Sequence, residues 1–330
     1  MAAPRSTARA SSLTWDTLGR DEQLALLVKL CTARAAEFRR KFDGVLTLGV
    51  GYKTQGGERT EALCLAFLVK DKKDKVGRPV PETILAFVER GGRRLRVYVP
   101  TDLEELGDGG PHVNANLASG ILAVGLPNPA VRCTGAVCCL VRQIDAPSNV
   151  YALGCHHVLA LSAQTQGCAA LVSEVISNDL PGEPVAQLFE YLPMSPNVRS
   201  CQDAAIALLD SSVNATWLHS GRRPLRTETA VHEPPGCRIY TPRGVLPAGY
   251  VKTWIDVPLF YPKCGWVYIA RTYQFQADTL PGDSGSAVMS DDGTLYGMHF
   301  WGQSSNRLSM AIPAATLFSP GLFSIDFDLA

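Results

Sequence analysis

The sequence has no excess of charge of either sign. Its 330 residues include 31 Lys and Arg and 31 Asp and Glu, so the formal net charge is +0 at pH 7. A protein that binds nucleic acid or a membrane surface through its overall charge needs a basic excess. The balance therefore excludes a general binder of either kind, and we expect local basic runs such as residues 70–75 to lie on a solvated face.

Long apolar runs and a secretion signal are also lacking. No run approaches the length of a membrane span, and the first twenty residues have no apolar core. We therefore expect a cytoplasmic protein without a membrane partner, with residues 1–14 disordered. The ten cysteines form no CxxC pair, which argues against a zinc site, and in the cytosol they would be reduced. We expect neither a metal nor a cofactor.

Enough apolar residues are present, at 46%, to build a core. Between residues 15 and 110 the pattern predicts a small α+β domain. Apolar residues recur at three- and four-residue steps over 21–42, which indicates an amphipathic helix with Gly44 as its stop; they are Leu24, Leu27, Val28, Cys31, Phe38 and Phe42. Two β-rich runs around a Gly-Gly turn predict a hairpin, and residues 93–103 another strand.

After the Gly-rich linker at 106–111 the pattern changes. Short β-rich runs follow one another, separated by Gly, Pro, Asn and Asp, and no repeat of fixed period is present. Such spacing is typical of an antiparallel barrel or sandwich. We therefore predict a mainly β domain over residues 111–330.

Three short motifs in this second part contain groups that could act together. The stretch TLPGDSGSAV contains Ser284 between an acid and a glycine, LGCHHVLAL contains two adjacent histidines, and Asp203 opens the apolar run AAIALL. An acid that opens a buried strand needs a partner. The chain order His, Asp, Ser excludes an α/β-hydrolase, in which serine comes first, and Ser286 stands where that elbow needs glycine.

These motifs resemble the chymotrypsin/trypsin-like serine protease superfamily over roughly residues 115–320. HHVLAL is similar to its His motif, DAAIALL to its Asp strand and GDSGSAV to its nucleophile loop. LYGMHFWG resembles the strand that follows, and SMAIPAATLF the closing strand of the high-temperature-requirement branch. A weaker resemblance links the N-terminal hairpin to the plant narrow-leaf protease and its bacterial relatives. The fold implied is a double antiparallel β-barrel.

The resemblance implies a role for each matching residue. Ser284 would be the nucleophile, His157 the general base and Asp203 the acid that orients it. The backbone N–H groups of Gly282 and Ser284 would form the oxyanion hole. A protein or peptide substrate would pair as an extended strand with Phe300, Trp301 and Gly302.

Alternatives remain at several of these positions. His156 competes with His157 and Asp210 with Asp203, and Trp301 alone is more often a core residue. Asp278 could select a basic side chain in the substrate or be an exposed loop acid. Asp283 lacks the newly cut N-terminus with which its counterparts in secreted digestive enzymes pair, so it needs another partner.

For the whole protein we expect a serine endopeptidase controlled by a regulatory partner, by the N-terminal domain or by oligomerisation. The alternatives are a trypsin-fold binding module without catalysis and a dedicated processing protease that cuts one partner or itself.

Overall fold

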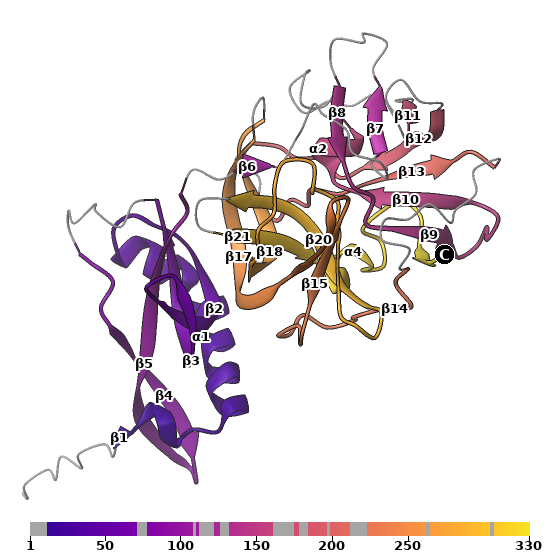
Figure 1. Ribbon diagram of the computed structural model, residues 1–330. Helices are drawn as coiled ribbons and strands as arrows, with labels where there is room; N and C mark the ends of the chain where they lie inside the picture. Colours follow the sequence, from indigo (N-terminus) through magenta and orange to yellow (C-terminus); the bar gives the residue numbers. More distant parts are fainter. Residues whose placement is uncertain are drawn as a thin grey trace, which may run out of the picture. The chain divides into compact units, whose positions relative to one another are not determined.

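A computed structural model describes residues 12–70, 78–107, 110–111, 122–125, 132–160, 175–177, 184–196, 199–211, 223–261, 264–303 and 307–330. The chain divides into two compact units, one ending at Leu106 and the other running from Gly107 to Ala330. Figure 1 shows the helices and strands of both units.

The first unit contains one long helix, α1 (Arg20–Lys41), after β1 (Ser12–Leu13) and the 3-10 turn η1 (Trp15–Thr17). The helix confirms the prediction over 21–42, but its buried face differs from the expected one. Leu24 and Val28 are exposed, because the buried stripe lies to one side of them and consists of Leu26, Leu27, Leu30, Cys31 and Phe38. On this stripe Phe38 packs edge-on against Phe67 of the sheet.

The predicted hairpin is β2 (Val45–Gln55) and β3 (Glu58–Val69), which pair antiparallel. Gly56 and Gly57 between them have φ of +61° and +86°, the left-handed conformation that a tight two-residue hairpin turn needs. The predicted third strand is β5 (Arg93–Glu105), which runs parallel to β3. It also pairs antiparallel with β4 (Thr83–Arg90), a strand that was not predicted from the sequence.

The strands of the second unit form two sheets that are antiparallel apart from a short parallel pairing of β14 with β20. In the first, the strand order is β22-β9-β10-β13-β12-β11-β7-β8. The bounds are β7 (Leu122–Gly125), β8 (Arg132–Gly135), β9 (Cys139–Gln143), β10 (Val150–Gly154), β11 (Val175–Ser177), β12 (Pro184–Tyr191), β13 (Ala205–Leu209) and β22 (Phe327–Leu329), with the one-turn helix α2 (His156–Leu159) after β10.

In the second sheet the order is β17-β18-β21-β20-β19-β15-β16, and β6 and β14 pair with β20 outside this path. The bounds are β6 (Gly110–Pro111), β14 (Arg226–Thr227), β15 (Arg238–Thr241), β16 (Gly244–Pro247), β17 (Gly249–Tyr261), β18 (Gly265–Gln276), β19 (Ala287–Met289), β20 (Thr294–Gln303) and β21 (Leu308–Pro313), followed by the helix α4 (Ala314–Leu317).

The prediction of a mainly β chain, with a small α+β unit before a unit built almost entirely of strands, is confirmed. Two segments of the first sheet contact the second sheet directly. The N–H of Ala136, after β8, donates to the carbonyl of Ser284 at 2.6 Å, and Cys155 Sγ, before α2, donates to the carbonyl of His299 in β20 at 3.4 Å. Residues from both sheets are thereby brought to one place.

Two other expectations can be compared with the structure. Among the described residues no helix is both long and apolar enough to cross a membrane. Seven described cysteines are buried and form no disulfide, but Cys264 is disulfide-bonded. The expectation that all ten cysteines are reduced is therefore wrong at this residue.

Candidate active site

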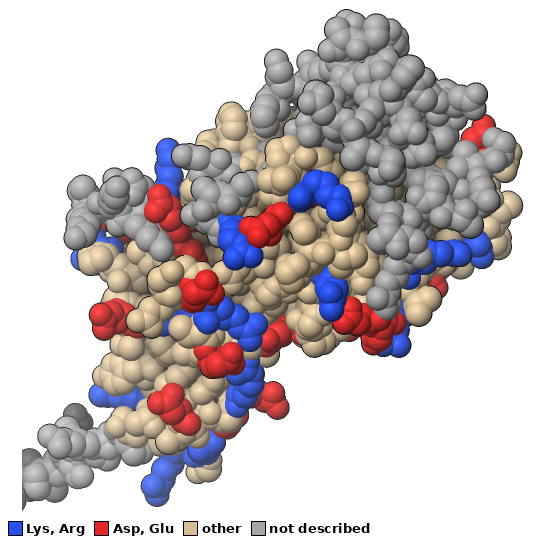
Figure 2. Space-filling view, viewed as in Figure 1, with Lys and Arg blue, Asp and Glu red and all other residues tan. Residues whose placement is uncertain are grey.

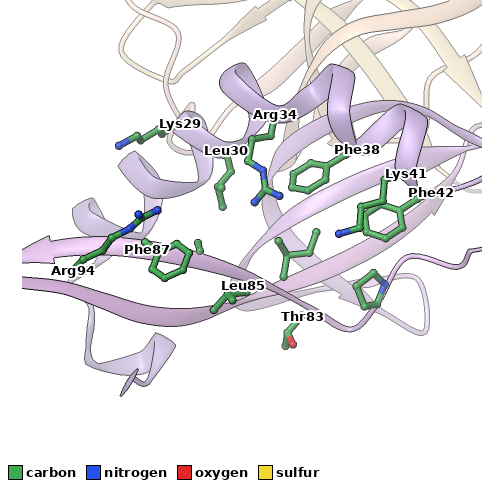
Figure 3. Close-up of a pocket in the computed structure, with 13 residues that line it drawn as sticks. Lys29, Leu30, Arg34, Phe38, Lys41, Phe42, Thr83, Leu85, Phe87 and Arg94 are labelled. Atoms are coloured by element: carbon green, nitrogen blue, oxygen red, sulfur yellow. The ribbon is translucent and has the colours of Figure 1, made fainter. Parts of the chain in front are cut away.

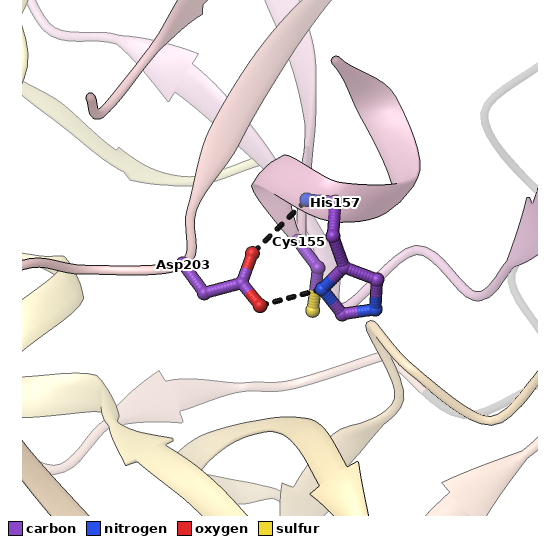
Figure 4. A group of neighbouring side chains, drawn as sticks. All are labelled: Cys155, His157 and Asp203. Carbon is purple, nitrogen blue, oxygen red and sulfur yellow. Dashed lines mark hydrogen bonds and ion pairs between the residues drawn. The ribbon is translucent and has the colours of Figure 1, made fainter. Parts of the chain in front are cut away.

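His157 and Asp203 form a buried, hydrogen-bonded pair (Figure 4). Asp203 Oδ2 lies 2.5 Å from His157 Nδ1, and Asp203 Oδ1 accepts the backbone N–H of His157 at 3.0 Å. The pair is positioned by α2, which carries the histidine, and by the segment that enters β13. Two bonds from one carboxylate fix both the position and the rotation of the imidazole, as a general base requires.

A third donor, Tyr261 at the end of β17, completes this group. Its hydroxyl donates to Asp203 Oδ2 at 2.7 Å. Burial by itself would raise the pKa of Asp203, but the attraction of His157 and the hydrogen bonds from His157 and Tyr261 hold it below its ordinary value. Burial, together with the neighbouring Asp203 charge, raises the pKa of Tyr261 well above its usual range, so Tyr261 remains a donor.

The competing residues point elsewhere. His156 Nδ1 lies 2.7 Å from the carbonyl oxygen of Leu192, and its ring packs edge-on against Tyr191. Burial lowers the pKa of His156. Asp210, the alternative acid, is exposed at the far end of β13. The geometry thus brings His157 to Asp203 and leaves His156 and Asp210 outside the pair.

Ser284 lies in a tight loop between β18 and β19, and the backbone of this loop requires glycine on both sides of the Asp283-Ser284 pair. Gly282 and Gly285 have φ of +101° and +96°. A Cβ on Gly285 would lie 1.8 Å from the Ala136 carbonyl oxygen, so only glycine fits there. The N–H groups of Asp283, Gly285 and Ser286 are all bonded within the protein, whereas those of Gly282 and Ser284 have no acceptor among the described residues.

The hydroxyl of Ser284 donates to the carbonyl oxygen of Phe300 on β20 at 3.2 Å. Ser284 is also fully buried. It lies beside the helix that carries His157, since Gly135 fits closely between Val158 and the Ser284 carbonyl. The Ser284 loop and α2 therefore lie close together, and the serine hydroxyl in this arrangement bonds the carbonyl of Phe300.

Asp283 has a partner that the sequence analysis missed. The Arg243 guanidinium, in the turn between β15 and β16, contacts both of its carboxylate oxygens, at 2.6 Å and 3.3 Å. The Leu280 N–H donates to the same carboxylate at 2.8 Å. Arg243 lies in a Pro-Arg-Gly turn with no motif around it, so no sequence signal connected it to a residue forty positions away.

Asp278 lies on the surface. Its side chain is 59% exposed, and Arg307 Nε contacts its carboxylate at 2.7 Å. An acid that faces solvent and is already paired fits the loop-acid alternative better than a selector of basic substrate side chains.

The predicted substrate strand is partly occupied by the chain itself. The side chains of Phe300 and Trp301 are buried, as core residues are. The backbone of β20 pairs antiparallel with β6, with Trp301 opposite Pro111 and Gly302 opposite Gly110. The strand therefore pairs with an extended segment, and in this structure that segment is the chain's own linker.

Cys155, His157 and Asp203 offer ligand atoms that lie within 4.8 Å of one another. The histidine nitrogen in this set already bonds the carboxylate, and the Cys155 thiol donates to His299. The cluster is thus explained by the His157–Asp203 pair without a metal.

Comparison with known proteins gives only distant likenesses. No protein-family model matches the chain, and neither does any curated protein. Among solved structures, Protease A of Thermobifida fusca is 14% identical at a TM-score of 0.43, covering 64% of this chain and 98% of its own. The Rv3671c protease of M. tuberculosis in its active form is 19% identical at 0.37, covering 59% and 75%. The MamO protease domain of Magnetospirillum magneticum is 16% identical at 0.34, covering 60% and 93%.

Proposed function

We propose that this chain is a trypsin-like serine endopeptidase. The observation that carries the proposal is the buried group of Asp203, His157 and Tyr261, with three hydrogen bonds to one carboxylate, next to the glycine-bounded loop of Ser284. Burying an unpaired carboxylate costs several kcal/mol of folding free energy. A carboxylate that is buried and given three donors therefore fits the task of holding an imidazole in one orientation.

In the proposed reaction His157 Nε2 takes the Ser284 hydroxyl proton as the oxygen attacks the substrate carbonyl carbon. The N–H groups of Gly282 and Ser284, which have no acceptor in the described part of the chain, receive the developing oxyanion. The peptide C–N bond then breaks, and the nitrogen leaves with the proton from His157. Water activated by the same imidazole hydrolyses the acyl ester and regenerates Ser284.

We also propose that activity is controlled. Ser284 is fully buried, its hydroxyl bonds Phe300, and β6 lies on the strand where substrate would pair. Each of these would have to change before a substrate carbonyl reached the serine. The controlling agent would be a regulatory partner or the N-terminal unit, and the protein would act in the cytoplasm on one partner or on many.

The same three observations favour one rival, a trypsin-fold binding module that does not use its serine. A fluorophosphonate probe separates the two, because it reacts only with an activated serine. We expect labelling of the full-length protein that disappears in Ser284→Ala and persists in the matched variant Ser286→Ala, two positions away and equally buried.

The endopeptidase proposal also predicts that the wild-type protein hydrolyses peptides and that Ser284→Ala does not. A protein that shows neither labelling nor hydrolysis, in cell extract as well as alone, would be a binding module.

A further inference from the structure

The first unit contains a groove between α1 and β4, with a volume of about 580 Å³ (Figure 3). Four of its lining side chains are cationic: Lys29, Arg34, Lys41 and Arg94. None of the thirteen lining residues is acidic. Arg34 already pairs with Glu37, with Nη2 and Oε1 2.7 Å apart, so the attraction of the rim for negative charge comes mainly from Lys29, Lys41 and Arg94.

The floor of the groove is apolar. Leu30 and Phe38 of α1 and Ile84 of β4 are buried there, whereas Leu85 and Phe87 remain 37% and 38% exposed. Two cations of the rim contact rings of this floor: the Arg34 guanidinium is 4.4 Å from the Phe38 ring centre and that of Arg94 is 4.0 Å from the Phe87 ring centre. A ligand that fits this surface is both apolar and anionic.

The backbone of β4 borders the groove. Thr83, Ile84, Leu85, Ala86 and Phe87 all line it, although successive side chains of a strand point to opposite faces. The groove thus runs along the strand's edge. Within the described part of the chain β4 pairs only with β5, so the N–H and C=O groups of its other edge can accept a further strand.

We propose that this groove binds an extended segment of a partner protein in which acidic residues alternate with apolar ones. The segment would add to the edge of β4, bury its apolar side chains on the floor and pair its carboxylates with the cations of the rim. The chain's own residues 1–11 do not suit the groove, since they contain two arginines and no acid. A fatty acid would satisfy one cation and leave the edge of β4 unpaired.

The test uses full-length Ser284→Ala protein, so its outcome does not depend on the proposed catalytic activity. The probe is a fluorescein-labelled peptide that alternates glutamate with leucine and phenylalanine, followed by fluorescence anisotropy. We expect saturable binding that weakens at least about fivefold in Lys29→Glu/Arg94→Glu, because two attractive charge pairs become repulsive. Arg40→Glu, an exposed cation of the same helix outside the groove, should leave the Kd unchanged.

Two ligand-side controls work on unaltered protein. Replacing the probe's glutamates by lysines should abolish binding, and proline at alternate positions should weaken it because proline cannot donate to a ladder. Slower amide exchange in residues 83–90 on binding would support strand addition. Equal binding by the acidic and basic peptides, no saturable binding, or groove-dependent binding of oleate vesicles without binding of the peptide would each overturn the proposal.

Discussion

Asp203 is a carboxylate without exposed surface, and three donors keep it ionised: the backbone N–H and ring of His157 and the hydroxyl of Tyr261. Asp283 is nearly as buried, at 1%, and relies on Arg243 and one backbone N–H. The site thus contains two buried acids with different tasks. One holds the imidazole, and the other holds the loop on which Ser284 lies.

Replacing Tyr261 by phenylalanine should lower the free energy of unfolding by about 1–2 kcal/mol at pH 7 and reduce kcat about threefold to thirtyfold. The pKa of Asp203 is lower in the folded than in the unfolded protein. The carboxylate therefore stabilises the fold at pH values above its unfolded-state pKa of about 3.9, and this stabilisation is lost as pH falls through its folded-state pKa. The difference between wild type and variant should therefore shrink from pH 7 to pH 3 in urea titrations.

Tyr151→Phe, which removes a hydroxyl bonded to Gln143 away from the site, is the matched control for Tyr261→Phe and should leave kcat unchanged. A Tyr261→Phe enzyme with wild-type kcat and an unchanged pH dependence of stability would show that this hydroxyl does not tune Asp203.

Arg243→Met should destabilise the protein by about 1–3 kcal/mol and reduce fluorophosphonate labelling about tenfold, because a buried Asp283 carboxylate loses its charged partner. Arg243→Met/Asp283→Asn should recover most of the stability. Arg307→Met removes the exposed pair with Asp278 and should change stability by no more than about 0.5 kcal/mol. Equal effects of the two arginine substitutions would refute a special role for Arg243.

At the scale of elements, β20 combines several tasks. The carbonyl of Phe300 accepts the Ser284 hydroxyl, the backbone of His299 bonds the Ser284 loop at two places, and Trp301 and Gly302 pair with β6. Its preceding turn is held by Asp292, whose carboxylate accepts from Ser290 and Thr294. One strand thus connects the Ser284 loop, the edge proposed to pair with substrate and the linker.

Gly110→Pro removes the N–H with which β6 can pair, and it should free the edge of β20 for substrate. We expect kcat/KM for an extended peptide to rise about threefold to tenfold, chiefly through a lower KM. The control is a small ester too short to reach Gly302, for which kcat/KM should not change. A rise of the same size for both substrates, or a fall for the peptide, would contradict competition by β6.

The turn before β20 gives a pH prediction. Hydrogen bonds from Ser290 and Thr294 lower the pKa of Asp292 to about 2. The Asp292 carboxylate stabilises the fold at pH values above its unfolded-state pKa of about 3.9, and this stabilisation is lost as pH falls towards 2. Asp292→Asn should therefore be less stable than wild type at pH 7 and approach it below pH 4, as measured by urea unfolding. A difference that does not vary with pH would contradict the charge as its cause.

At the scale of the whole molecule, charges of both signs are interspersed on the face shown in Figure 2, as the zero net charge allows. Near-zero net charge weakens electrostatic repulsion between molecules. We expect solubility to pass through a minimum near pH 7 and to rise by pH 9, as measured by light scattering of concentrated samples. Highest solubility at pH 7 would show that the exposed charges are not balanced as the composition implies.

Much of the fold followed from local pattern. The sequence predicted α1, the hairpin β2–β3 and the mainly β second unit. These elements could be predicted because the spacing of apolar residues and the position of turn residues are signals carried by neighbouring residues. Helix α1 also shows the limit of such patterns. Leu24 and Val28 belong to the apolar stripe by spacing, but the sheet covers a different arc of the helix and leaves them exposed. Edge strand β4 was missed for a similar reason, since its pairing with β5 is its main support.

For the site, the sequence by itself determined the candidate groups: a serine between an acid and a glycine, a histidine pair and an acid that opens an apolar strand. Only the tertiary structure decided between His156 and His157, gave Asp203 its Tyr261 donor, paired Asp283 with Arg243 and laid β6 on β20. The physical reason is distance along the chain. Hydrogen bonds and ion pairs depend on side-chain positions within about 3 Å, and no periodicity connects residues that folding brings together from two different sheets.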